Sequence, residues 1–182
     1  NDLRQQEYNM IVLPSTLADG DTIDIRLRLP NGADYIVLSK KKVKLADLNG
    51  AVSATTILIN VTEDQILTMS AAIVDAYKIS GSKLYATKYT DPGLQAVATA
   101  TYIPSNDTIN LIDKDPNIVT TARNALITRY NENYSTYRTG IQSTINSIES
   151  STQQSRVESG TSSETATQQA ERKTYLDSLA GE

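Results

Sequence analysis

The stretch Thr55–Gln65, TTILINVTEDQ, decides the fold, because in it a strand runs directly into the start of a helix. The run Thr55–Val61 is rich in β-branched residues and predicts a buried strand. Thr62 and Gln65 then match a capping box, in which the Thr side chain accepts from the Gln amide and the Gln side chain reaches back. A sheet packed against a helix is therefore expected.

Apolar residues continue the helix after the capping box at a spacing of three or four, which gives one apolar stripe: Ile66, Leu67, Met69, Ile73, Val74 and Tyr77. Gly81 is a suitable end for this helix. The next residues, Lys83–Thr90, alternate between two faces and predict another strand. The pattern thus indicates strand, helix and strand in succession.

Before this stretch the sequence predicts a short strand over residues 8–14 and then a β-hairpin. Ile23, Ile25, Leu27 and Leu29 alternate with Asp24, Arg26 and Arg28, the period of a half-buried strand. Asn31-Gly32 is a strong hairpin signal, and the return strand covers about Asp34–Leu45.

Three consecutive lysines, Lys40, Lys41 and Lys42, lie in the return strand. Lysines commonly keep a strand solvated or protect a sheet edge. They are alternatively a patch for an anionic partner. Both interpretations stay open at this point.

After residue 93 the pattern weakens. Residues 96–103 (AVATATYI) and 108–112 are consistent with short strands, and Asp115-Pro116 with a helix start. Apolar residues then recur every three or four positions: Ile118, Ala122, Leu126, Tyr130, Tyr134 or Tyr137, Ile141, Ile145 and Ile148. Such a narrow stripe predicts a long helix that packs on its own domain or on a second arm, or alternatively along a neighbouring molecule.

The C-terminal part is polar. Residues 150–163 form a Ser/Thr/Gln/Gly tract, which predicts a linker, and residues 164–180 predict a last helix. We therefore expect two parts: a β/α domain over residues 1–113 and a helical arm over residues 114–182. We also expect the domain to fold without the arm.

Composition excludes several classes of site. The chain has no Cys and no His, which rules out thiolate metal sites, His-dependent catalytic triads and HExxH zinc sites. The net charge of −4 argues against a broad nucleic-acid surface. No apolar run approaches the roughly 20 residues that a membrane-spanning helix needs.

No motif indicates catalysis or a cofactor. Asp19, Asp21 and Asp24 lack the Gly and distal Glu of a calcium loop, and Asp113 and Asp115 suit a helix start. Neither GxGxxG nor GxxxxGK[ST] occurs. Ser39-Lys40 and the run Ser80–Lys83 show no supporting pattern for a catalytic dyad. We expect a protein that is not an enzyme and carries no cofactor or metal.

Ten tyrosines supply all the aromatic character, because Phe and Trp are absent. Tyr85, Tyr89 and Tyr102 fall in predicted strands, and Tyr130, Tyr134 and Tyr137 crowd one helical stretch. They either replace Phe and Trp in the core or form stacking platforms for carbohydrate or cell wall. The candidate partner contacts are accordingly Lys40, Lys41, Lys42, Tyr85, Tyr89, Tyr130, Tyr134 and Tyr137.

Three short motifs in order resemble the SAF-like region of the CpaB/RcpC family of Flp/Tad pilus-assembly proteins. Gly20, Asp21 and Asp24 match its first element, Lys42-Val43 its second, and residues 61–65 (VTEDQ) its strand-to-helix junction. A closing strand follows, and the resemblance covers about residues 10–91. The sequence departs from the family at Thr62, where Pro is usual, in the absence of the first strand and the upstream membrane helix, and throughout the arm.

The resemblance implies a small β-clip-like domain with one packed helix. It also implies an extracytoplasmic scaffold of a pilus machine, anchored to the membrane through a segment upstream of residue 1. Its partners would be other pilus-assembly or membrane-complex proteins, with self-association through the arm as a further expectation. The alternative function, binding of cell wall or carbohydrate by exposed tyrosines, comes from the residues alone.

Overall fold

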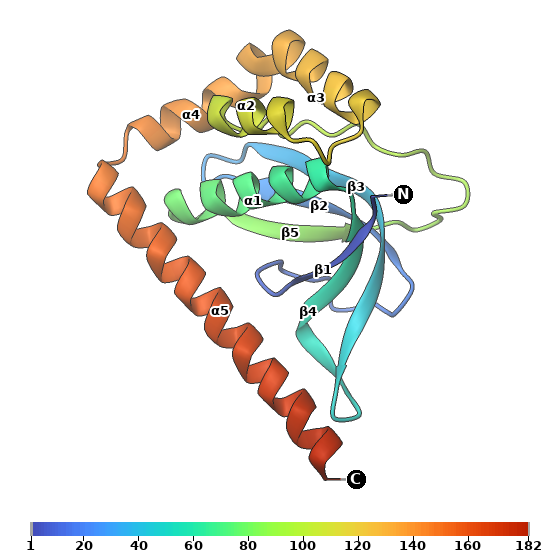
Figure 1. The fold of residues 1–182 in the computed structure, drawn as a ribbon. Coiled ribbons are helices and arrows are strands. Elements are labelled where there is room, and N and C mark those ends of the chain that lie inside the picture. The colour runs from blue at the N-terminus through green and yellow to red at the C-terminus, as the bar shows by residue number, and fades with distance from the viewer. Residues whose placement is uncertain (1, 182) are drawn as a thin grey trace.

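The computed structural model describes residues 2–181 and has the α+β class expected from the sequence. The strands are β1 (Arg4–Tyr8), β2 (Thr22–Arg28), β3 (Asp34–Leu48), β4 (Ala51–Val61) and β5 (Lys83–Lys88). The helices are α1 (Glu63–Lys78), α2 (Asn106–Lys114), α3 (Thr120–Asn133), the π-helical η1 (Tyr134–Arg138), α4 (Thr139–Asn146) and α5 (Ser150–Ala180). In Figure 1, α1 lies between the sheet and the layer formed by α2, α3 and α4.

The five strands form one antiparallel sheet in the order β1-β4-β3-β2-β5. The expected strand over residues 8–14 is wrong in extent, since β1 ends at Tyr8 and only Val12 returns to the sheet. Val12 bridges Tyr85 on β5, the opposite edge from β1. The first residues therefore contact both edges of the sheet.

The predicted hairpin of β2 and β3 is confirmed, with Gly32 in its turn at a φ of 90° that favours glycine. Its register shifts near Lys40, which has a φ of 52° and marks a β-bulge. Asp24 is buried there rather than exposed as the alternation predicted. The Asp24 carboxylate accepts hydrogen bonds from the Lys40 amide and the Ser39 hydroxyl, both at 2.8 Å, and so stabilises the bulge.

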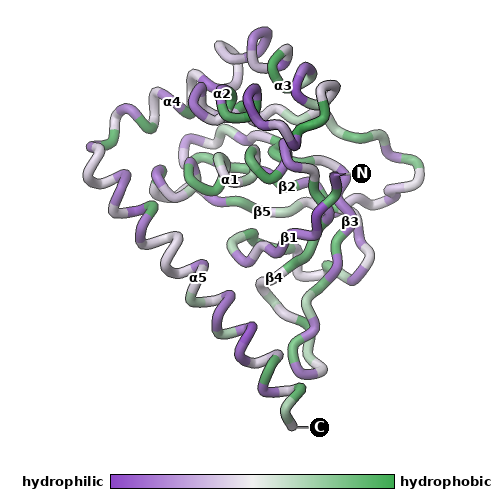
Figure 2. Tube along the Cα trace, viewed as in Figure 1, coloured by the Kyte–Doolittle hydropathy of each residue, from purple (hydrophilic) through white to green (hydrophobic). Residues whose placement is uncertain are grey.

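The core lies between α1 and the sheet. The capping box at Thr62 is present, and Met69 and Ala72 of α1 are fully buried against Ile25, Leu27 and Ile57 of the sheet. A second cluster joins α2 to α3 through Ile109, Ile112, Ile118 and Leu126. Figure 2 shows hydrophobic residues gathered in α1 and the sheet, and a largely hydrophilic α5.

The arm packs on its own domain, which confirms the intramolecular alternative. Ile141 and Ile145 of α4 are buried in the same cluster as the sheet residues. Tyr137 and Ile148 pack against that cluster as well. The helix α4 thus contributes to the main core rather than standing apart from it, and the expectation that residues 1–113 fold alone stays a prediction.

Several expectations for the second half of the chain are wrong. Residues 96–103 form no strand, although the Thr101 and Tyr102 amides donate to the Ile36 carbonyl of β3. Residues 108–112 lie in α2, because Ser105 caps that helix and Ile109 and Ile112 face inward. The helix expected at Asp115-Pro116 begins at Thr120. The expected linker over residues 150–163 is the first half of α5, whose polar residues include no Pro to interrupt the helix.

We predict that Ile141→Ala lowers the free energy of unfolding by about 2–5 kcal/mol, because it leaves a cavity at a fully buried site between α4 and the sheet. Urea unfolding followed by circular dichroism measures the change. The exposed neighbour Ser143→Ala is the control and should change stability by only about 0.5 kcal/mol. Equal stabilities for the two variants would show that α4 is not part of the core.

Candidate functional site

The three candidate lysines do not form one patch. The Lys40 ammonium donates to the Gln95 carbonyl at 2.8 Å, whereas the Lys41 ammonium reaches the Asn60 carbonyl and the Gln65 side chain near α1. Burial lowers the pKa of Lys41, and the nearby Asp64 offsets part of that effect. Lys42 alone is exposed. The bulge at Lys40 separates these side chains. Three consecutive lysines in the sequence therefore do not make one continuous cationic surface.

Tyr85 lies on the outer face of the sheet within an ionic cluster. Its hydroxyl donates to Asp34 at 2.5 Å and accepts from Arg28 at 2.9 Å. The Arg28 guanidinium lies 4.6 Å from the ring centroid and the Lys83 ammonium 5.7 Å. Burial alone would raise the pKa of Asp34, but its bonds from Tyr85 and Arg26 lower it overall. The cationic groups of Arg28 and Lys83 therefore already contact the Tyr85 ring, on which a sugar would stack.

The other tyrosines divide between core and surface. Tyr89 is buried, and its hydroxyl lies 3.1 Å from the Ser39 hydroxyl, so it is not the exposed contact that was predicted. Tyr130 and Tyr134 are half-buried, with ring centroids 5.0 Å apart. Tyr137 packs against the main core. The set does not form one stacking platform.

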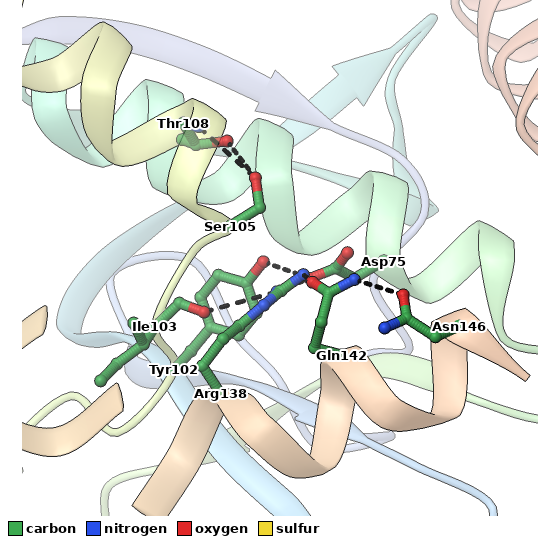
Figure 3. Close-up of polar contacts among 8 residues, drawn as sticks. All are labelled: Asp75, Tyr102, Ile103, Ser105, Thr108, Arg138, Gln142 and Asn146. Carbon is green, nitrogen blue, oxygen red and sulfur yellow. Dashed lines mark hydrogen bonds and ion pairs between the residues drawn. The ribbon is translucent and has the colours of Figure 1, made fainter. Parts of the chain in front are cut away.

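A buried polar network lies between α1, η1 and the segment that leads into α2 (Figure 3). Asp75 of α1 accepts an ion-pair hydrogen bond from Arg138 of η1 and a hydrogen bond of 2.7 Å from the Tyr102 hydroxyl. The Arg138 guanidinium also donates to Gln142 at 2.8 Å. All three members of the core triad, Asp75, Tyr102 and Arg138, are buried.

Burial and charge act on this network in opposite senses. Burial would lower the pKa of Arg138, but Asp75 more than compensates and raises it. Burial, with Asp75 beside it, raises the pKa of Tyr102 well above the usual value. Arg138 and Tyr102 therefore stay protonated at neutral pH and act as donors to Asp75. The network holds together α1, η1 and the segment that leads into α2.

A groove of about 350 Å³ lies over this network, between α1, α2 and α4. Its walls include Leu67, Val74 and Leu111, and its floor includes Asp75 and Arg138. The Arg138 Nε is buried and has no hydrogen-bond partner. The groove is also lined by polar residues, among them Lys78, Asp107 and Gln142, so its surface is mixed rather than apolar.

Four exposed apolar side chains lie on regular elements at one end of the molecule: Val52 of β4, and Tyr175, Leu176 and Leu179 of α5. We term this set of residues the tip surface. The turn of the β3–β4 hairpin and the end of α5 lie together there, because Asn49 shares a hollow with Thr174 and Asp177. In Figure 1 both elements extend away from the other helices. A second hollow of about 410 Å³ separates α5 from the hairpin, with Leu45, Leu58 and Tyr175 among its lining residues.

Sequence patterns alone did not indicate the Asp75–Arg138 pair or the tip surface. A usable signal for the pair was a charge at position 75, three residues after the buried Ala72. No comparable signal marked Arg138, which lies in a polar stretch (YSTYR). The tip surface depends on α5 returning beside the hairpin, which no local pattern indicates.

We predict that Asp75→Leu destabilises the chain by about 3–5 kcal/mol, because Arg138 is then a buried charge without its partner. The double variant Asp75→Leu with Arg138→Met should lose less stability than the sum of the two single variants. Urea unfolding of the four proteins in this cycle measures the coupling. Asp177→Leu, which breaks the exposed pair with Lys173, is the control and should have little effect. Additive losses of stability in the double variant would contradict an energetic coupling between Asp75 and Arg138.

No helix within residues 2–181 combines the length and apolar character needed to cross a membrane. In the same residues, no three potential metal-ligating side chains come together. Comparisons of the chain with protein-family models, with curated proteins and with solved structures found no match.

Proposed function

We propose that this chain is a non-catalytic assembly component that works through protein–protein contacts in a pilus machine of the Flp/Tad type. In this proposal it acts outside the cytoplasm, tethered to the membrane through a segment upstream of residue 1. Its partners are other proteins of the machine, and it needs no cofactor. The β domain supplies a rigid frame, and the arm and the hairpin present the contact surface.

The tip surface is the observation that carries this proposal. Val52 is 62% exposed and Leu179 is 53% exposed, although both are large apolar residues. They lie where two elements extend beyond the other helices (Figure 1). Apolar groups that cluster on an exposed surface are typical of a contact site for another protein. The tip is therefore the part of the surface best suited to a partner.

The positions of the family-like motifs support the pilus assignment. Gly20 and Asp21 lead into β2, Lys42-Val43 lies in β3, and the junction of β4 with α1 carries the third motif. β2 and β3 are paired, and β4 is paired with β3. The three motifs thus meet in one part of the sheet, and this proximity supports the proposal that they belong to one SAF-like unit.

We predict that the double variant Leu176→Asp with Leu179→Asp lowers recovery of pilus-machine proteins by about tenfold or more, because buried apolar anchors dominate protein interfaces. The measurement is cross-linking in source cells, affinity purification of the full chain, and quantitative mass spectrometry. The matched control, Thr165→Asp with Gln169→Asp, adds the same charge at exposed positions of α5 away from the tip.

Two results would contradict the proposal. Recovery of no pilus-machine protein by the unaltered chain would remove the assigned partners. Equal loss in the tip variant and its control would show that charge on α5, rather than the tip surface, governs binding. Retention of the unaltered chain on purified cell wall, reduced by Tyr85→Ala, would instead favour the carbohydrate alternative.

A further inference from the structure

The long helix α5 docks on the rest of the molecule through a stripe that is almost entirely polar. No residue of α5 is buried. The half-buried positions are Thr152, Gln153, Arg156, Val157, Gly160, Glu164, Thr167, Gln168, Glu171 and Ser178. Six of them recur every three or four residues and form what we term the inward stripe: Gln153, Val157, Gly160, Glu164, Gln168 and Glu171. Only Val157 in that stripe is a large apolar residue. Hydrophobic burial therefore contributes little to the docking of α5.

Gly160 makes the closest approach to the body. A Cβ at this position would lie 2.6 Å from the Cγ and Cδ1 ring atoms of Tyr77. Tyr77 belongs to α1, which packs between the sheet and the other helices. Because the overlap involves Cγ, at the base of the Tyr77 ring rather than at the far end of the side chain, only glycine allows α5 to lie at this depth.

Two carboxylates follow Gly160 along the stripe. Glu164 accepts a hydrogen bond of 3.1 Å from the Tyr77 hydroxyl, and its backbone carbonyl accepts one of 3.0 Å from the Asn9 amide group. Glu171 accepts from the hydroxyls of Ser53, Thr55 and Thr56 on β4 at 3.1, 3.4 and 2.6 Å. These contacts specify which helix fits and in which register.

The connection between α4 and α5 is short and bent. It consists of residues 147–149, and Glu149 is extended with a ψ of 139°. The Gln153 side chain donates to the carbonyls of Ile145 and Ile148 at 2.9 and 2.8 Å and so holds the bend. The bend therefore acts as a hinge that side-chain hydrogen bonds keep closed.

A helix held only by exposed or half-buried polar groups opens at a lower free energy than the core. Once released, α5 has little helix propensity of its own over residues 150–163, which are rich in Ser and contain Thr152, Thr161 and Gly160. Release exposes the Tyr77 ring and the hydroxyls of Ser53, Thr55 and Thr56 on β4, which then lose their contacts with α5. An identical helix from another molecule carries all the groups that satisfy them.

We propose that α5 is a releasable strap over a helix-binding surface on α1 and β4, and that α5 of a second copy of the chain takes its place. The surface selects a helix with glycine at one position and glutamates four and eleven residues later, the spacing of Gly160, Glu164 and Glu171. An exchange of this kind creates the same contacts between copies as within one copy. The inference rests on the proposed assembly role for its purpose in the cell, but the groups that dock α5, which are Tyr77, Glu164, Glu171 and the hydroxyls of β4, are different residues from those of the tip surface.

The test uses the full chain with Gly160→Ala, which improves helix propensity yet clashes with Tyr77. Hydrogen exchange followed by mass spectrometry should show α5 amides exchanging about tenfold or more faster, with the strands unchanged. Ser162→Ala, at an exposed position of the same helix, is the control and should leave exchange unchanged. Unchanged α5 exchange in Gly160→Ala, or faster exchange of the whole chain, would overturn the strap.

A labelled peptide of residues 150–180 then tests the second part by fluorescence anisotropy. It should bind the Gly160→Ala chain about tenfold or more tightly than the unaltered chain, whose own α5 occupies the surface. The same peptide with alanine at position 160 should bind neither chain. Equal binding of the two peptides, or no binding of the unaltered peptide to the Gly160→Ala chain, would overturn docking between copies. Either result leaves the tip-surface experiment unaffected, so the two proposals fail separately.

Discussion

The buried ion pair between Asp75 and Arg138 is the constraint on which the placement of the helices depends. A buried charge needs its partner in place, so α1 and η1 cannot separate without a large cost. Tyr102 binds the same carboxylate and thereby positions the segment that leads into α2. The π-helical turn η1 shifts the phase of the helical chain, which before it packs Leu126 toward α2 and after it packs Ile141 into the main core.

The sequence predicted the elements whose stability comes from local patterns. Alternation in β2, the Asn31-Gly32 turn and the capping box at Thr62 each specify their structure within a few residues. Patterns failed where a distant contact decides the outcome. Asp24 is buried because a bulge on the neighbouring strand requires its carboxylate, and residues 96–103 take their path from contacts such as the hydrogen bonds to the Ile36 carbonyl. Neither partner is visible from the local residues.

The candidate contacts were harder to predict than the fold. Residue type alone suggested that Tyr85 and Tyr89 were equivalent, whereas β5 carries one into an ionic cluster and the chain beyond β5 carries the other into the core. The low apolar content of residues 150–163 suggested a linker, because helical packing is usually recognised from an apolar stripe. In α5 the inward stripe is polar, so the hydropathy pattern of the sequence does not indicate which face of the helix is docked.

The polar docking of α5 has a mechanical consequence for a chain under tension. Force applied between the two ends acts on α5 at one end and on β1 of the sheet at the other, and α5 is the more weakly held of the two, because mostly polar contacts dock it. At the other end, β1 is bound to β4 and Val12 to β5, so the first residues cannot be peeled from one edge only. A pull therefore detaches α5 first, and its 31 residues supply about 46 Å of helical length before the load falls on the core. The molecule thus has an extensible end and a stiff end, which suits it to link a fixed support to a moving one.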